Sequence, residues 1–302
     1  MKTTESSHIM SLLYSHTSDY LTVNSLDLHT ERWIPANKAV RDCTLVLLNH
    51  GMFGNTYNWR FLGPFLAEKG FFVLAIDMVG FGLSCRCTNF VHGHDDRARL
   101  LWGVIQHVEQ EYSISDTLKW VIIAHSMGCA SAIMMKKEKE HKIERLIFIA
   151  PALQPVIPAV AKFICSLRPL RPLIYPITKA VLKRRSRFER SLIKAYGRVP
   201  TEEEIEGHFT PLQMPETHKC LVKMMATQSE DIGVDLIRSI GDLPRLIIWG
   251  DKDAVVPLEE GRWLEELLNT SIVVIEGEGH CPAETNPEET NHIIWDWLSK
   301  TP

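Results

Sequence analysis

The chain has 302 residues, and 45% of them are hydrophobic, which is enough for a substantial core in one large domain or in a domain that carries an insertion. Its formal net charge of -4 at pH 7 provides no overall attraction to nucleic acid or to an anionic membrane. Any electrostatic partner must therefore be recognised by a local patch, and nucleic acid is not expected as a partner.

Targeting and redox features favour a cytoplasmic location. Residues 1–20 are polar and lack the cationic and apolar blocks of a secretory signal, so export is not expected. The long uncharged run at residues 120–135 is too short to span a bilayer comfortably and is interrupted by a histidine and a serine. The seven cysteines are an odd number without a Cys-x-x-Cys pair, so they predict neither a disulfide framework nor a zinc ribbon.

Short apolar runs and amphipathic segments alternate through the first half of the chain. They predict, in order, a strand at residues 44–48, a helix at 59–69, a strand at 71–77, a helix at 95–112 and a strand at 120–124. Further strands are expected at 145–150, 245–249 and 271–276. Apolar strands that alternate with helices are typical of a mostly parallel sheet covered on both faces, so the predicted fold class is α/β.

The alternation stops between residues 154 and 237, where helical patterns punctuated by proline contain no strand. We therefore predict a core formed by residues 1–153 and 238–302, with a helical cap, or lid, inserted at 154–237.

The expected cap contains a strongly basic segment. Residues 160–200 include eleven Lys or Arg and a single acid, Glu189. Apolar residues recur in this segment at spacings compatible with one helical face, namely Ile177, Val181, Phe188, Leu192 and Tyr196. Two interpretations remain open: a lid helix packed on the core with a solvated cationic face, or a surface for anionic lipid or an acidic ligand.

A serine lies between a predicted strand and a predicted helix. The strand ends at Ala124 and the helix begins near Gly128, so Ser126 occupies a tight turn with a small residue on either side. Such a turn forces its middle residue into an unfavourable backbone conformation and exposes the side chain at the end of the sheet. The unpaired N–H groups of the following helix stabilise negative charge at the same place, which is typical of a site that presents a nucleophile.

The sequence Ala124-His125-Ser126-Met127-Gly128 resembles the nucleophile elbow G-x-S-x-G of the α/β-hydrolase family, with alanine in place of the first glycine. The resemblance covers about residues 40–153 and 240–300 and implies that the cap is inserted between the sixth and seventh strands of that fold. It also implies that Ser126 is activated by an acid and a histidine that follow it in the chain.

Two later loops supply these partners. Residues 250–257, GDKDAVVP, resemble the family's G-x-x-D-x-x-V-P loop and select Asp253 as the acid, while Asp251 remains the rival. The loop at 151–154, which carries the acid in some relatives, contains no carboxylate. Glu278-Gly279-His280 resembles the family's Gly-His ending and identifies His280 as the base.

Residues 47–55, LLNHGMFGN, resemble the family's His-Gly-x loop. The resemblance implies that the backbone N–H groups of Met52 and Met127 form an oxyanion hole, which stabilises the charge that develops in acyl transfer. His50 and His125 are expected to be structural, hydrogen-bonded histidines. The D-x-x-G-x-G-x-S pattern within residues 59–84 also matches the family, and we assign its residues a structural role: Asp77, Gly80, Gly82 and Ser84.

Other chemistries are not favoured. The run HGHDD at residues 92–96 lacks the last histidine of a metallo-β-lactamase-like motif, and its two aspartates suit a helix N-terminus, so no metal site is predicted. No phosphate-binding G-x-x-x-x-G-K-[ST] loop is present. Cys281 lies on the loop of the base, away from the elbow, and is expected to be a packing residue.

We therefore predict a serine hydrolase that cleaves carboxylic esters through an acyl-enzyme and needs neither cofactor nor metal. Relatives with aspartate at the elbow are dehalogenases and epoxide hydrolases, and Ser126 argues against both. The expected partner is a small, lipophilic ester, with peripheral membrane contact through the basic cap. Two alternatives remain: a receptor-like relative that binds a ligand with little or no hydrolysis, and a C–C bond hydrolase.

Overall fold

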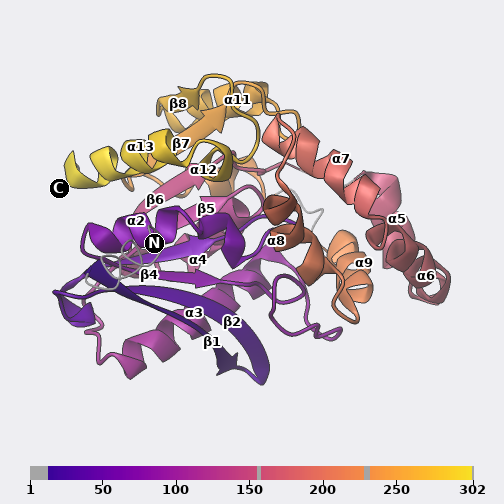
Figure 1. The fold of residues 1–302 in the computed structure, drawn as a ribbon, viewed down its shortest axis with the longest axis horizontal. Helices are drawn as coiled ribbons and strands as arrows, with labels where there is room; N and C mark the ends of the chain where they lie inside the picture. The colour runs from indigo at the N-terminus through magenta and orange to yellow at the C-terminus, as the bar shows by residue number, and fades with distance from the viewer. Residues whose placement is uncertain (1–12, 155–157, 228–231, 301–302) are drawn as a thin grey trace, which may run out of the picture.

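The computed structural model describes residues 13–154, 158–227 and 232–300 and contains a sheet of eight strands in the order β1-β2-β4-β3-β5-β6-β7-β8 (Figure 1). The strands are β1 (Tyr14–Val23), β2 (Leu26–Pro35), β3 (Thr44–Asn49), β4 (Phe71–Ile76), β5 (Trp120–His125), β6 (Ile143–Ile149), β7 (Arg245–Gly250) and β8 (Ile272–Ile275). β1 and β2 are antiparallel to their neighbours, and the others are parallel. The predicted α/β class is confirmed.

Six strands lie where the sequence predicts them, but β1 and β2 were not predicted. Most side chains of β1 are exposed, so its sequence lacks the apolar run on which the other predictions depend. β1 pairs with β2 along its full length, and the two are joined at Asn24 and Ser25, which both have positive φ. Residues 1–12, to which most of the expectation about export refers, lie outside the described residues.

Helices cover both faces of the sheet because its apolar side chains alternate between them. Leu45 and Leu47 of β3 pack in one cluster with α3 (His94–Glu111), α4 (Gly128–Glu138) and α11 (Leu258–Leu268). Val46 and Leu48 face the opposite side, against α2 (Leu62–Glu68) and α13 (Pro287–Lys300). The helix expected at 59–69 is divided into a short 3-10 helix η2 (Thr56–Trp59) and α2.

Among the residues that the structure describes, six helices lie between β6 and β7, and they are here called the inserted helices. They are α5 (Ala159–Ser166), α6 (Arg171–Leu182), α7 (Arg185–Tyr196), α8 (Glu202–Leu212), α9 (Thr217–Thr227) and α10 (Val234–Arg238), and the 3-10 helix η4 (Arg168–Leu170) joins α5 to α6. Within the described part of the chain, no helix is long and apolar enough to cross a membrane.

The single helical face predicted across residues 177–196 is wrong. α6 ends at Leu182 and α7 begins at Arg185, and Arg184 between them has an extended backbone (ψ 90°) that separates the two helices. Leu192 and Tyr196 of α7 are buried as expected, but no residue of α6 is buried and Ile177 is 64% exposed. The apolar residues therefore belong to two faces with different surroundings.

The turn after β4 has the structural role that the sequence predicts. The Asp77 carboxylate accepts hydrogen bonds from the backbone N–H of Thr56 (2.6 Å) and Leu83 (2.8 Å) and from His29 Nδ1 (2.8 Å). Gly82 has φ +50, and a Cβ there would lie 2.0 Å from Asp77 Cγ, so only glycine fits. Ser84 Oγ donates to the Asp77 carbonyl and accepts from the His29 N–H.

Candidate active site

Ser126 lies on a strained turn between β5 and α4. Its φ is 52, in the left-handed region, and the turn is held by a hydrogen bond from its N–H to the Ile149 carbonyl (2.9 Å). A Cβ at Gly128 would lie 2.7 Å from the carbonyl oxygens of Asn49 and His50, so the glycine lets α4 approach the end of β3. The sharp turn predicted from the sequence is therefore present, and it directs Ser126 into the main cavity.

The structure brings Ser126, His280 and Asp253 together in one hydrogen-bonded chain. Ser126 Oγ donates to His280 Nε2 (2.9 Å), and His280 Nδ1 donates to Asp253 Oδ2 (2.6 Å). All three residues are buried. This arrangement provides a base that can accept the hydroxyl proton and a carboxylate that orients that base.

The two rival acids of the loop after β7 have different partners. Asp253 Oδ1 accepts from the backbone N–H groups of Val255 (2.8 Å) and Val256 (2.9 Å), which leaves Oδ2 directed at His280. Asp251 is exposed and accepts from the Gly277 N–H (2.6 Å). The geometry therefore favours Asp253 over Asp251 as the partner of His280.

Two backbone amides are available beside the serine. Met52 and Met127 line the same cavity as Ser126, and neither of their N–H groups donates a hydrogen bond to a described residue. The loop that carries Met52 approaches the elbow closely, because a Cβ at Gly51 would lie 2.8 Å from Ser126 Cβ. These two amides are therefore the donors to test for the oxyanion hole that the sequence predicts.

The neighbouring histidines are buried and form hydrogen bonds to the backbone. His50 Nδ1 donates to the Gly51 carbonyl (2.7 Å), and its Nε2 accepts from the Met78 N–H (3.0 Å). His125 Nε2 donates to the His280 carbonyl (2.8 Å). Desolvation lowers the pKa of His50 to about 4 and that of His125 to about 3. Both imidazoles are therefore neutral at pH 7 and support the loops of the site.

These pKa shifts predict that the protein loses stability below pH 6.5. Burial also lowers the pKa of His92 to about 2 and that of His94 to about 4, so four folded-state imidazoles resist protonation. Below 6.5 the unfolded chain binds protons that the folded chain does not, and each histidine then lowers the free energy of unfolding by roughly 1.4 kcal/mol per pH unit. Urea denaturation between about pH 7 and about pH 5 measures this slope. A free energy of unfolding that does not change over that range would contradict the prediction.

The aspartates of the HGHDD run have the helix-start role expected from the sequence. Asp95 and Asp96 lie in the first turn of α3, as expected, and pair with Arg99. Within the residues that the structure describes, no group of three or more His, Cys, Asp or Glu is arranged to hold a metal ion.

The cavity at Ser126 has a volume of about 510 Å³ and lies between the core and the inserted helices. The core contributes the elbow and the loops of Met52 and His280. The inserted helices contribute mainly apolar side chains, namely Val181, Leu182, Phe188, Leu192 and Leu212. The site is therefore enclosed by segments that are distant in sequence, and the part of its wall that the inserted helices form is largely apolar.

A second buried polar cluster, centred on Glu284, was not predicted. Glu284 lies on the short helix α12 (Pro282–Thr285), which follows the loop of His280, and its side chain lines the same cavity as Ser126. Its carboxylate accepts hydrogen bonds from four side chains: Asn58 Nδ2 (2.6 Å), Arg60 Nη1 (2.5 Å), Tyr196 Oη (2.9 Å) and His208 Nε2 (2.9 Å). Burial raises the pKa of Glu284, but His208 and Arg60 outweigh it and lower the pKa to about 2. Since Tyr196 and His208 come from α7 and α8, the cluster fastens the inserted helices to the core.

A backbone contact also joins α7 to the loop of the base. The His280 N–H donates to the Ala195 carbonyl near the end of α7 (2.7 Å). A Cβ at Gly279 would lie 2.5 Å from that same carbonyl oxygen, so the loop needs glycine for this approach. Cys281, next to His280, is buried in an apolar cluster with Leu192 and Tyr196, as expected of a packing residue.

Comparison with known proteins gives a consistent result. A family model described as the alpha/beta hydrolase fold matches residues 44–287. The uncharacterized hydrolase YugF of Bacillus subtilis is 22% identical over 92% of this chain and 96% of its own length. A 2-hydroxy-6-oxo-6-(2'-aminophenyl)hexa-2,4-dienoic acid hydrolase of Metapseudomonas resinovorans is 24% identical over 94% of this chain and 96% of its own. Among solved structures, a thermophilic esterase from Thermogutta terrifontis superposes with a TM-score of 0.72 at 22% identity, covering 94% of this chain and 98% of that one.

Proposed function

The chain belongs to the α/β-hydrolase fold family, and from this membership we propose that it is a serine hydrolase that cleaves carboxylic esters of lipophilic acids. The observation that carries the proposal is the hydrogen-bonded chain from Ser126 through His280 to Asp253. It provides a nucleophile, a base and an orienting acid within one cavity.

In the proposed reaction, Ser126 Oγ attacks the acyl carbon while His280 Nε2 takes the hydroxyl proton. The negative charge then lies on the former carbonyl oxygen, where the N–H groups of Met52 and Met127 stabilise it; one such donor is typically worth about 2.7 to 4 kcal/mol. His280 returns its proton to the leaving alcohol, and an acyl-enzyme remains. Water, activated by the same imidazole, releases the acid and restores Ser126.

The lining of the cavity supports a lipophilic acyl group. Val181, Leu182 and Phe188 contribute apolar surface to the lining, and the single carboxylate of the lining, Glu284, is already engaged by Arg60 and His208. When an acyl chain enters this space, its apolar surface is removed from water, which stabilises the complex by about 25 cal/mol per Å² of apolar surface buried.

The proposal is tested by labelling the full chain with a fluorophosphonate probe and by measuring turnover of p-nitrophenyl esters of graded chain length. We expect covalent labelling that requires Ser126 and is lost in Ser126→Ala, together with a preference for longer acyl chains. If the protein binds these esters but is neither labelled by the probe nor turns the esters over, it is instead a receptor-like relative.

A second candidate, C–C bond hydrolysis of a carboxylate substrate, is favoured by one feature of the cavity. Arg187 and Lys194 of α7 line it, and in the described part of the chain neither has a salt-bridge partner. The Metapseudomonas relative is named for the hydrolysis of such an acid. Turnover of a 2-hydroxy-6-oxohexa-2,4-dienoate in preference to p-nitrophenyl esters would select this candidate.

A further inference from the structure

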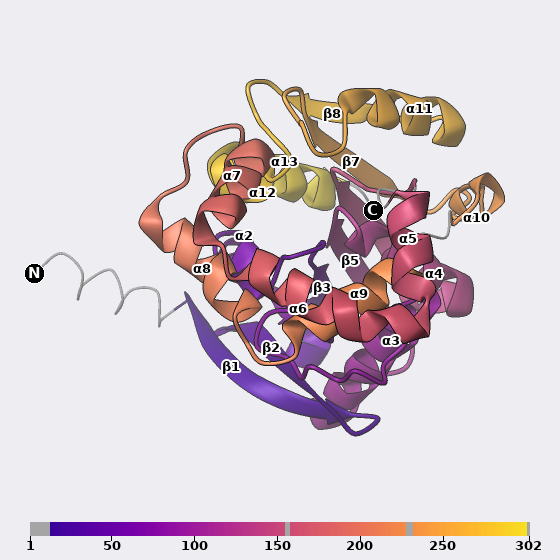
Figure 2. The ribbon, with the colours of Figure 1, turned by 90° about the vertical axis from the view of Figure 1, so that its right-hand side faces the viewer.

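The outer surface of α6 is apolar, although it faces solvent. Leu173, Pro176, Ile177 and Ala180 are exposed and are spaced three or four residues apart, so they form one stripe along the helix. The opposite side of α6 lies against α9 (Figure 2). A helix at the surface of a globular protein normally turns its polar side outward, and α6 does the reverse.

The exposed stripe continues on α5. Val160, Phe163 and Ile164 are exposed at the same helical spacing, and α5 also packs on α9. Six of the fourteen large apolar side chains that are exposed in the described residues lie between positions 160 and 177. Exposed apolar side chains concentrated in this way mark an interaction surface, whereas scattered ones do not. We call these two helices and their outward stripes the α5–α6 surface.

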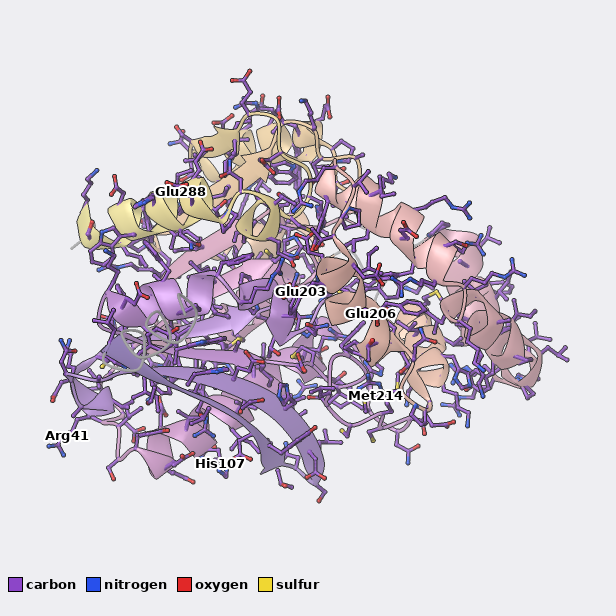
Figure 3. All side chains as sticks on the ribbon, in the orientation of Figure 1. Arg41, His107, Glu203, Glu206, Met214 and Glu288 are labelled. Atoms are coloured by element: carbon purple, nitrogen blue, oxygen red, sulfur yellow. The ribbon has the colours of Figure 1, made fainter. Side chains whose placement is uncertain are left out.

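The charge of the α5–α6 surface has one sign. Residues 151–188 contain no aspartate or glutamate. Six cations surround the stripes, and none has a salt-bridge partner in the described ranges: Lys162, Arg168, Arg171, Lys179, Lys183 and Arg184. By contrast, Arg185 at the start of α7 pairs with Glu202 and Glu206 of α8, the second of which is labelled in Figure 3.

We propose that the α5–α6 surface docks the protein on an anionic lipid bilayer. Apolar side chains of two helices that lie side by side can enter the boundary between headgroups and acyl chains, while the surrounding Lys and Arg contact anionic headgroups. A second copy of the chain would bring two cationic surfaces together, so the charge disfavours self-association through this face. The inference does not depend on the chemistry at Ser126.

Docking in this way places the catalytic cavity near the bilayer. Ile177 lies in the exposed stripe of α6, whereas Val181 and Leu182, about one turn further along the same helix, line the cavity. Figure 1 shows α5 and α6 at the edge of the molecule opposite the C-terminus, with α7 leading back towards the core. A lipophilic ligand therefore has a short path from the membrane to Ser126.

The test is flotation of the full chain with vesicles of phosphatidylcholine alone or of phosphatidylcholine with phosphatidylserine. We expect binding to the anionic vesicles that weakens at high salt, and at least about tenfold weaker binding of the variant Leu173→Ser/Ile177→Ser. The matched control is Tyr20→Ser on β1, which removes a similarly exposed apolar side chain (53%) from another element and should bind like wild type.

Circular dichroism and turnover of a water-soluble ester show whether the variants keep their fold, because neither Leu173 nor Ile177 lines the cavity. Three results overturn the proposal. The first is an absence of binding to either kind of vesicle, and the second is equal binding of wild type and Leu173→Ser/Ile177→Ser. The third is dimerisation, in size-exclusion chromatography, that this variant abolishes while vesicle binding is unchanged.

Discussion

Replacement of His280 by alanine is expected to lower kcat for ester hydrolysis about 10⁶-fold, with a much smaller effect on KM. His280 Nε2 is the acceptor for Ser126 Oγ at 2.9 Å, and no other base contacts this hydroxyl in the described residues. His125 cannot substitute, because its Nε2 donates to the His280 carbonyl and its pKa is about 3. Steady-state kinetics with a p-nitrophenyl ester measure the loss.

Two controls separate a chemical role of His280 from a structural one. Exogenous imidazole should restore part of the activity of His280→Ala, since it can occupy the space left beside Ser126, but it should not restore Ser126→Ala. His141→Ala removes an exposed histidine and should leave kcat within about twofold of wild type. Activity of His280→Ala comparable to that of His141→Ala would exclude His280 as the base.

The variant Asp253→Asn is expected to lower kcat about 10⁴-fold while the protein remains folded. The carboxylate accepts from His280 Nδ1 at 2.6 Å, which fixes the tautomer and stabilises the imidazolium that forms during catalysis. A carboxamide at this position is neutral and can donate to Nδ1, which favours the wrong tautomer. The pH profile of kcat/KM should change together with kcat, because the essential base is then perturbed.

Asp251→Asn is the matched control, since it makes the same chemical change two residues away. Asp251 accepts from the Gly277 N–H, and an amide oxygen can do the same, so we expect kcat within about threefold of wild type. Comparable losses in Asp251→Asn and Asp253→Asn would mean that the loop, and not the contact with His280, determines the activity.

The sequence predicted those parts of the molecule whose evidence is local. Apolar runs such as residues 44–48 and 120–124 identify buried strands, and the small residues around Ser126 identify the sharp turn. β1 escaped prediction because most of its side chains are exposed, and its stability comes from pairing with β2 rather than from an apolar pattern. The helix break at Arg184, between α6 and α7, was not predicted because no proline or glycine lies there.

The Glu284 cluster could not be predicted for a different reason. Its members lie at positions 58, 60, 196, 208 and 284, which are far apart in the chain, and no spacing connects the groups. Only the folded arrangement shows that one carboxylate serves all four partners. The direction in which α6 turns its apolar side was likewise undetermined, since the periodicity of a helix does not state which neighbour it meets.

The hydrogen bond between the His280 N–H and the Ala195 carbonyl links the position of α7 to the position of the catalytic imidazole. If α7 swings away to widen the entrance, this bond breaks and the imidazole loses one of the contacts that aim it at Ser126. An open cavity and an aligned His280 are then alternative states, and Ser126 is fully activated only when α7 lies against the loop of His280.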